Sequence, residues 1–226
     1  PDTATERALL AEGSGSTVRL TPWGVYTPPE GRTILLPGRA PAIMLIGTGL
    51  DARAFHACLA GVAEAVKLAP DLLVFADALA VRRSGSWAVA AKLGIRERLS
   101  LIEELESRRD LLVQGDIIVQ PEARGEQRSV ILEAMAAGMA VAAAADPMVH
   151  ILQNGVTARL APSHDVAAWG RMLTEMLTQH DATRVLANRG REFVREHRRA
   201  SEHVRTVLAA YQWLSSAEPI PFADRA

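Results

Sequence analysis

The chain has little cysteine and few aromatic residues. Its 226 residues include one cysteine, Cys58, and aromatic side chains make up 4% of the composition. A single cysteine excludes an intrachain disulfide and fits a reducing compartment, so we expect a cytoplasmic protein. Cys58 falls on the apolar side of a predicted helix with no evident cationic neighbour, and we therefore expect a core residue rather than a reactive thiol.

Long apolar runs and an excess of one charge are also missing. No segment approaches the ~20 apolar residues of a membrane span, and the first residues do not have the charged, apolar and small-residue pattern of a signal peptide. The net charge is −1, and the arginines are scattered among 26 carboxylates. A protein that binds a phosphate backbone needs a basic patch, so nucleic acid is not an expected partner. With 49% hydrophobic residues, the composition is that of a soluble globular protein.

Short apolar runs alternate with amphipathic segments along the chain. The runs predict strands over residues 43–46, 72–75, 99–102, 116–120, 141–145 and 157–160. The intervening segments have helical spacing and predict helices within residues 55–66, 87–93, 104–113, 129–137 and 148–153. This alternation predicts an α/β fold, with helices on both faces of a parallel sheet.

The two ends differ from this central pattern. A helix stub over 1–12 and a strand over 17–20 are expected first, and residues 22–41 are a Pro- and Gly-rich loop typical of an interdomain linker. The last third is predicted to be helical. It carries two apolar stripes, both expected in the core: Trp169, Met172, Leu173, Met176 and Leu177, then Val204, Val207, Leu208, Tyr211 and Leu214.

The stretch beginning at Asp116 combines a strand, a polar turn and a helix. Three apolar residues follow Asp116, and Pro121 ends the strand because it has no N–H to donate. The helix begins near Ser129 and Val130, where free N–H groups can face phosphates. Glu133 is the lone charge in that apolar helix, and its carboxylate can accept two hydrogen bonds from a ribose diol. The pattern indicates a nucleotide site.

This stretch resembles the C-terminal half of a GT-B glycosyltransferase of family 4, the glycosyl transferases group 1. In that family an Asp-led strand ending in Pro-Ser is followed by a loop and a helix with the sequence Leu-Glu-Ala-Met-Ala, which residues 132–136 reproduce. The resemblance implies a Rossmann-like domain and a UDP- or GDP-type nucleotide-sugar donor. It further implies sugar transfer with retention, and neither a metal nor another cofactor.

The resemblance also assigns site residues one at a time. The family has two glutamates eight residues apart, of which the second binds the donor ribose and matches Glu133. Gly125 occupies the first position, so Glu126 beside it is the catalytic or sugar-contact candidate. Arg128 replaces part of a Gly-Phe-Gly run and offers a forked donor to the diphosphate.

Further family positions lie in the loop after the first strand and beyond residue 140. The family has Gly-Arg where this chain has Gly47 and Thr48, and Lys-Gly where it has Arg53 and Ala54. His150 stands where the family has the glutamate of Gly-Gly-x-x-Glu. The expected donor site is therefore Gly47, Thr48, Arg53, Arg128, Ser129, Val130 and Glu133.

The resemblance covers roughly residues 20–195 and suggests three parts. Residues 1–40 would be an interdomain linker with a remnant of an N-terminal domain, 41–200 the nucleotide-sugar-binding domain, and 201–226 a C-terminal helix and tail. A missing N-terminal domain would bind the acceptor and allow peripheral membrane contact. A bacterial-type enzyme is expected.

Two alternatives stay open. The first is a glycosyltransferase-like module without turnover, because several polar family positions are replaced. The second is an NAD-binding domain, because Gly47-Thr48-Gly49 lies between a strand and a helix and Asp77 ends the next strand.

Overall fold

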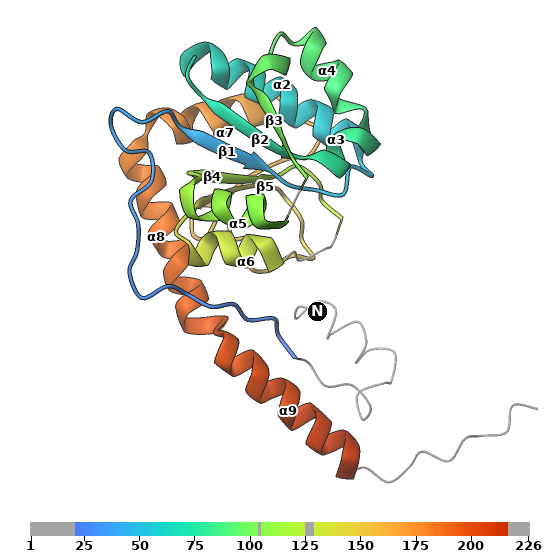
Figure 1. Cartoon of the computed structure of the whole chain (residues 1–226), viewed down its shortest axis with the longest axis vertical. Helices are drawn as coiled ribbons and strands as arrows, with labels where there is room; N and C mark the ends of the chain where they lie inside the picture. Colours follow the sequence, from blue (N-terminus) through green and yellow to red (C-terminus); the bar gives the residue numbers. More distant parts are fainter. Residues whose placement is uncertain (1–20, 104, 125–128, 217–226) are drawn as a thin grey trace, which may run out of the picture.

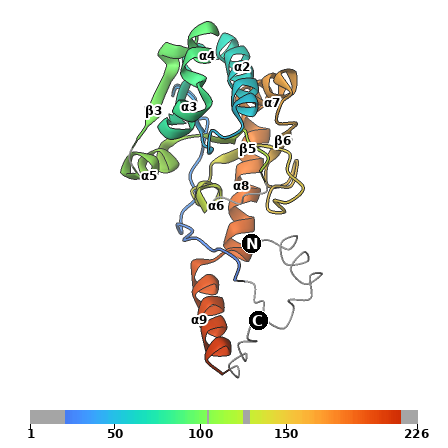
Figure 2. The same ribbon diagram turned by 90° about the vertical axis from the view of Figure 1, so that its right-hand side faces the viewer.

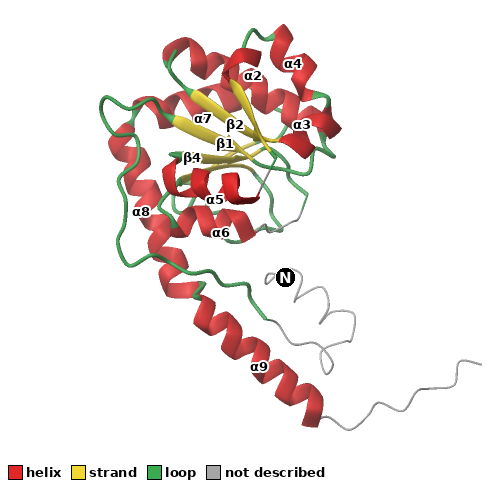
Figure 3. Ribbon diagram, in the orientation of Figure 1, coloured by secondary structure: helices red, strands yellow, loops and turns green. Residues whose placement is uncertain are grey.

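A parallel six-stranded sheet forms the centre of the molecule (Figures 1 and 3). The computed structural model describes residues 21–103, 105–124 and 129–216. In these residues the strand order is β3-β2-β1-β4-β5-β6, the order of a Rossmann-type sheet. The strands are β1 (Ala42–Leu45), β2 (Leu73–Asp77), β3 (Leu99–Ile102), β4 (Ile117–Gln120), β5 (Ala140–Ala144) and β6 (Arg159–Ala161).

Helices cover both faces of this sheet (Figure 1). They are α2 (Ala52–Leu68), α3 (Ala78–Ser84), α4 (Ser86–Lys92), α5 (Leu105–Gln114), α6 (Ser129–Ala136), α7 (Val166–Thr178), α8 (His180–His197) and α9 (Ala200–Ser216), with a 3-10 turn, η1 (Arg96–Arg98). Successive strand residues point to opposite faces of the sheet. Ile43 and Leu45 pack with α2 and α7 on one face, while Met44 and Ile118 pack with α6 on the other. The predicted fold class is confirmed.

The helix on one face, α2, is held by its cap and by close contact with α7. The Asp51 carboxylate accepts a hydrogen bond from Ala54 N–H at 3.0 Å, which caps the start of α2. Gly61 lies directly against Trp169, since a Cβ built there would stand 2.5 Å from the Trp169 Cβ. Trp169 itself is fully buried. The two helices therefore approach more closely than larger side chains would allow.

The loop predicted before the first strand packs along the domain. Ile34 and Leu35 within it are buried. The buried Asp116 carboxylate accepts hydrogen bonds from Leu35 N–H and Ala42 N–H, each at 2.8 Å, and pairs with Arg39. Asp116, the residue that leads the fourth strand, thus attaches this loop to the amino end of β4.

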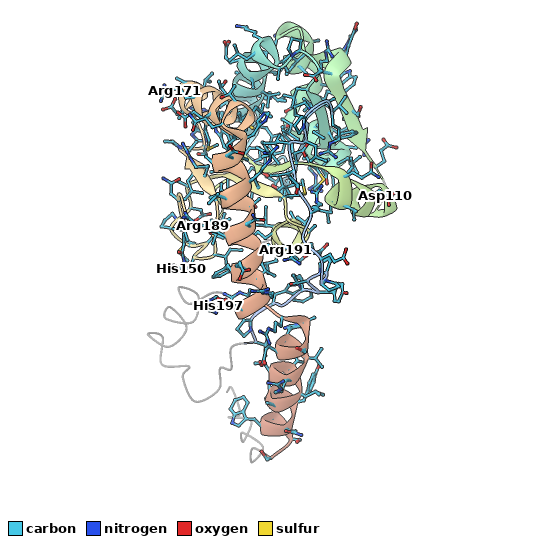
Figure 4. All side chains as sticks on the ribbon, turned by 90° about the vertical axis from the view of Figure 1, so that its left-hand side faces the viewer. Asp110, His150, Arg171, Arg189, Arg191 and His197 are labelled. Carbon is cyan, nitrogen blue, oxygen red and sulfur yellow. The ribbon has the colours of Figure 1, made fainter. Side chains whose placement is uncertain are left out.

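Two arginines on α8 also form hydrogen bonds with this loop. Arg184 donates to Ile34 O at 3.0 Å, and Arg191 donates to Pro28 O at 2.5 Å. Figure 4 shows Arg189, Arg191 and His197 following one another along α8. The loop therefore has fixed contacts on two sides.

The six strands predicted between residues 43 and 160 are confirmed to within about two residues. The helices predicted over 55–66, 87–93, 104–113 and 129–137 are present as α2, α4, α5 and α6, and the first C-terminal stripe lies on α7. The helix predicted over 148–153 is wrong, because the chain forms turns there. The Thr157 hydroxyl bonds to Ile151 O and accepts from Gln153 N–H, while Asp146 accepts from Met148 N–H, and these bonds replace the helical ladder. The short helix α3 was not predicted.

The prediction that both C-terminal stripes are buried is half wrong. The stripe on α7 is buried, whereas Val204, Leu208, Tyr211 and Leu214 on α9 are more than half exposed. Figure 2 shows α9 continuing away from the sheet beyond α8. The elements predicted over 1–12 and 17–20 lie outside the described residues. None of the described helices combines the length and apolar character needed to cross a membrane.

Candidate functional site

A polar cleft of about 450 Å³ lies at the carboxyl ends of β1 and β2, beside the start of α6. It is lined by Gly47, Thr48, Asp77, Leu79, Arg83, Ser129 and Val130. β1 lies between β2 and β4 in the sheet, and the helices that follow β1 and β4 pack on opposite faces. Open parallel sheets bind their ligands at such a reversal of strand order. The cleft is thus the first candidate for a ligand site.

The loop after β1 is folded around a carboxylate that the sequence did not single out. Glu122 follows Pro121 at the end of β4 and is only 3% exposed. It accepts hydrogen bonds from the Thr48 hydroxyl at 2.8 Å, Asp51 N–H at 2.9 Å and Gly49 N–H at 3.3 Å, and another from Thr48 N–H. These bonds join the end of β4 to the start of α2.

The hydrogen bonds determine the protonation of Glu122. Burial alone would raise the pKa of this carboxyl, but the bonds from Asp51, Thr48 and Gly49 stabilise its charged form more strongly. The net result is a pKa below the ordinary value for glutamate. Glu122 is therefore a carboxylate at neutral pH.

The two glycines of this loop are needed for its shape. Gly49 has φ +73°, and a Cβ there would stand 2.8 Å from the Ala80 Cα. A Cβ on Gly47 would overlap the Phe55 ring and stand 2.5 Å from the Glu122 carboxylate. Gly47 and Thr48, both predicted for the donor site, line the cleft, but Thr48 N–H is directed at Glu122.

The predicted ribose ligand, Glu133, is half-buried in the second turn of α6. Ser129 and Val130, which line the cleft, lie four and three residues before it and so share its side of the helix. Within the described part of the chain, the side chain of Glu133 has no hydrogen-bond or ion-pair partner. Glu133 itself is not among the residues that line the cleft, and its carboxylate pairs with none of the described cations.

Of the two arginines predicted for the donor site, Arg53 and Arg128, only Arg53 is among the described residues. Arg53 is exposed as the second residue of α2 and does not line the cleft. Glu126 and Arg128 lie outside the described residues. Arg83, which no sequence motif indicated, lines the cleft and donates to Thr48 O at 3.4 Å. Asp77 accepts a hydrogen bond from Ala80 N–H at 3.0 Å and caps α3.

Two further hollows lie on the domain, one at the same edge of the sheet as the cleft and one at the opposite edge. One of about 540 Å³ follows β5 and includes Asp146 and His150, so it opens at the same edge as the cleft. Another of about 390 Å³ includes Arg159 at the start of β6 and Glu175 near the end of α7. This last hollow lies at the amino edge of the strands. We favour the cleft at the carboxyl ends because the strand order reverses there.

A family model matches more than half of the chain. Residues 43–179 match the family described as Glycosyl transferases group 1. The chain is 32% identical over 155 residues to a D-inositol 3-phosphate glycosyltransferase from Mycobacterium sp. (strain KMS). That alignment covers 60% of this chain and 35% of the relative, so the chain spans about a third of the length of the curated relatives it matches.

Solved structures share the fold. Sucrose-phosphate synthase from Thermosynechococcus elongatus superposes with a TM-score of 0.72 at 18% identity, over 94% of this chain and 57% of that one. The Anabaena HepE protein, solved in complex with UDP-glucose, superposes with a TM-score of 0.65 at 17% identity, over 79% of this chain and 50% of that one. At these identities the likeness establishes a common architecture.

Proposed function

The chain belongs to the glycosyl transferases group 1 and forms the C-terminal domain of their GT-B fold, and from this premise we propose that it binds a nucleotide-sugar donor for sugar transfer. The observation that carries the proposal is the polar cleft at the reversal of strand order, between the β1 loop and the start of α6. HepE, with the same fold, was solved with UDP-glucose, which supports a UDP-type donor. A GDP-type donor is the alternative.

In this proposal Glu133 accepts hydrogen bonds from the ribose diol. Its half-buried position one turn beyond Ser129 and Val130, which line the cleft, supports the role, as does the lack of a side-chain partner among the described residues. The amides at the start of α6 face the phosphates. Arg128, just before α6 in the sequence, adds a cation, and Glu126 contacts the transferred sugar. Arg53 is a weaker candidate because it is exposed and outside the cleft.

The reaction would be transfer with retention at the anomeric carbon. The bond from that carbon to the β-phosphate oxygen breaks, a bond to an acceptor oxygen forms, and the acceptor proton leaves. The negative charge that develops on the departing diphosphate is what the cleft must stabilise. We assign the acceptor to a separate N-terminal domain, with residues 1–40 as the connection, 41–200 as the donor domain and 201–226 as the terminal helix and tail.

A binding module without turnover is the second candidate. The observation in its favour is that Glu122 occupies N–H groups of Thr48, Gly49 and Asp51, which are then unavailable to a leaving phosphate. Donor hydrolysis or transfer by the complete protein would distinguish the two candidates, since only an enzyme releases the nucleoside diphosphate.

The donor site can be tested by calorimetry with UDP, GDP, UDP-glucose and NAD. We expect Glu133→Ala to weaken binding of the preferred nucleotide by about 1–3 kcal/mol, because charged hydrogen bonds to the ribose are lost. Glu64→Ala is the matched control, since Glu64 is an exposed helical glutamate on α2 paired with Lys67. Equal affinity in wild type and Glu133→Ala would remove the ribose role, and binding of none of the nucleotides would remove the donor site.

A further inference from the structure

We infer that Arg83 binds the diphosphate of the donor and is the residue by which the cleft distinguishes a nucleoside diphosphate from a nucleoside. This inference rests on the proposed function of the cleft and assigns one part of it. It starts from the β1 loop, whose hydrogen-bond donors at Thr48, Gly49 and Asp51 are directed at Glu122. A phosphate in the cleft must therefore be bound by groups outside this loop, namely the amides at the start of α6 and a cationic side chain.

Arg83 is the one cationic residue that lines the cleft in the part of the chain described here. Its guanidinium reaches over the β1 loop and donates to Thr48 O at 3.4 Å. This is a long hydrogen bond to a neutral acceptor, and a phosphate oxygen is a stronger one. The side chain is exposed and has no ion-pair partner among the described residues. Arg83 is thus available to a ligand.

Arg83 lies next to the corner at which α3 ends and α4 begins. It is the second-last residue of α3, which ends at Gly85 in the left-handed conformation with φ +66°. The buried Ser84 hydroxyl bonds to Ala80 O at 2.7 Å and lies 2.6 Å from the Ser86 hydroxyl. These bonds hold the junction of α3 and α4, so the backbone that carries Arg83 is well supported.

The neighbouring arginine shows that position, not charge alone, sets this role. Arg82 points away from the cleft and pairs with Glu103 at 3.1 Å. Consecutive helical residues are directed about 100° apart, so Arg83 faces the β1 loop instead. Asp77 also lines the cleft, and its carboxylate disfavours an anion beside it. We therefore place the diphosphate next to Arg83 and the amides at the start of α6.

The chemistry of the guanidinium fits a diphosphate. Its planar fork can donate two parallel hydrogen bonds to phosphate oxygens, whereas a lysine ammonium acts as a point charge. A nucleoside that lacks phosphates makes no use of this group. Loss of Arg83 should therefore weaken nucleoside diphosphates selectively.

The experiment is calorimetric titration of wild type, Arg83→Ala, Arg83→Lys and Arg82→Ala with UDP and GDP, and with uridine and guanosine. We expect Arg83→Ala to weaken the preferred diphosphate about 10- to 100-fold and to leave the matching nucleoside within about twofold. Arg83→Lys should lie between the two. Arg82→Ala is the control, because it removes the same charge from the same helix outside the cleft, and it should match wild type.

Three results would overturn the inference. Wild-type affinity for the diphosphate in Arg83→Ala would exclude the contact, and equal losses in Arg82→Ala and Arg83→Ala would indicate a general charge effect. An equal loss of nucleoside and diphosphate affinity would indicate a structural defect, which melting curves of the variants check. A wild-type protein that binds neither diphosphate removes the donor site itself, a result distinct from a normal wild type with an unaffected Arg83→Ala.

Discussion

Among single side chains, Glu122 contributes most clearly to the shape of the site. Its carboxylate accepts four hydrogen bonds from the loop between β1 and α2. Glu122→Gln places an amide NH₂ among these donors, so we expect the free energy of unfolding at pH 7 to fall by about 1–3 kcal/mol. Urea unfolding would measure the change. Glu64→Gln, on the exposed surface of α2, should leave the midpoint unchanged.

The same carboxylate predicts a dependence on pH. The pKa of Glu122 is held below its ordinary value of about 4.3, so its contribution to stability is full above that value. As pH falls through the lowered pKa of the folded state, the carboxylate is protonated and the contribution disappears. The stability difference between wild type and Glu122→Gln should therefore shrink in acid. A difference that stays constant from neutral pH to pH 3 would contradict this role.

The sequence predicts part of this site and cannot predict the rest. Glu133, Ser129 and Val130 belong to one continuous motif, so local spacing suffices to place them around a helix start. Glu122 and Thr48 are 74 residues apart, and they meet only because β1 pairs with β4. No local pattern reports which strands are neighbours. Arg83 was missed for a related reason, because its position depends on the unpredicted helix α3.

Between helices, the contact of α2 with α7 allows a paired test on two glycines. A Cβ at Gly61 would stand 2.5 Å from the Trp169 Cβ, whereas a Cβ at Gly170 would stand 3.6 Å from the Glu64 side chain, at ordinary contact distance. We expect Gly61→Ala to destabilise the protein by about 1–3 kcal/mol through overpacking. Gly170→Ala should stabilise it by about 0.5–1 kcal/mol, because alanine favours the helix.

Thermal unfolding of both variants shows whether each substitution lowers or raises the stability of the protein. The pair is informative since both glycines lie in the interior of a helix and both substitutions add one methyl group. Helix propensity alone would stabilise both proteins. A stabilised Gly61→Ala would therefore show that α2 and α7 can separate, contrary to the close packing described above.

Elements with strong local periodicity were predictable, and elements set by tertiary contacts were not. The apolar spacing on α2 and α7 identifies both helices because each has a face to bury. Residues 148–153 have similar spacing, but the Thr157 hydroxyl and the Asp146 carboxylate bond to backbone groups there and stabilise turns. The apolar spacing of α9 predicted the helix correctly, but the predicted burial of its stripe is wrong. Periodicity does not indicate what covers an apolar face.

For the chain as a whole, stability should come from the sheet and the helices packed on it, with little from the outer part of α9. The start of α9 is attached through Val25, which exchanges backbone hydrogen bonds with Arg198 and Ala200, whereas Leu208 is 57% exposed. We expect Leu208→Ser to change the free energy of unfolding by less than about 0.5 kcal/mol. Leu173→Ala, in the buried stripe of α7, should cost about 2–5 kcal/mol.

Urea unfolding of the two leucine variants tests this division. Both replace a leucine on an apolar helical stripe with a small residue, so the two positions differ chiefly in burial. A large loss of stability in Leu208→Ser would mean that the α9 stripe is covered in this chain, by another segment or by a second copy. Repeating the measurement over a tenfold range of protein concentration separates those two causes, because only contact between copies depends on concentration.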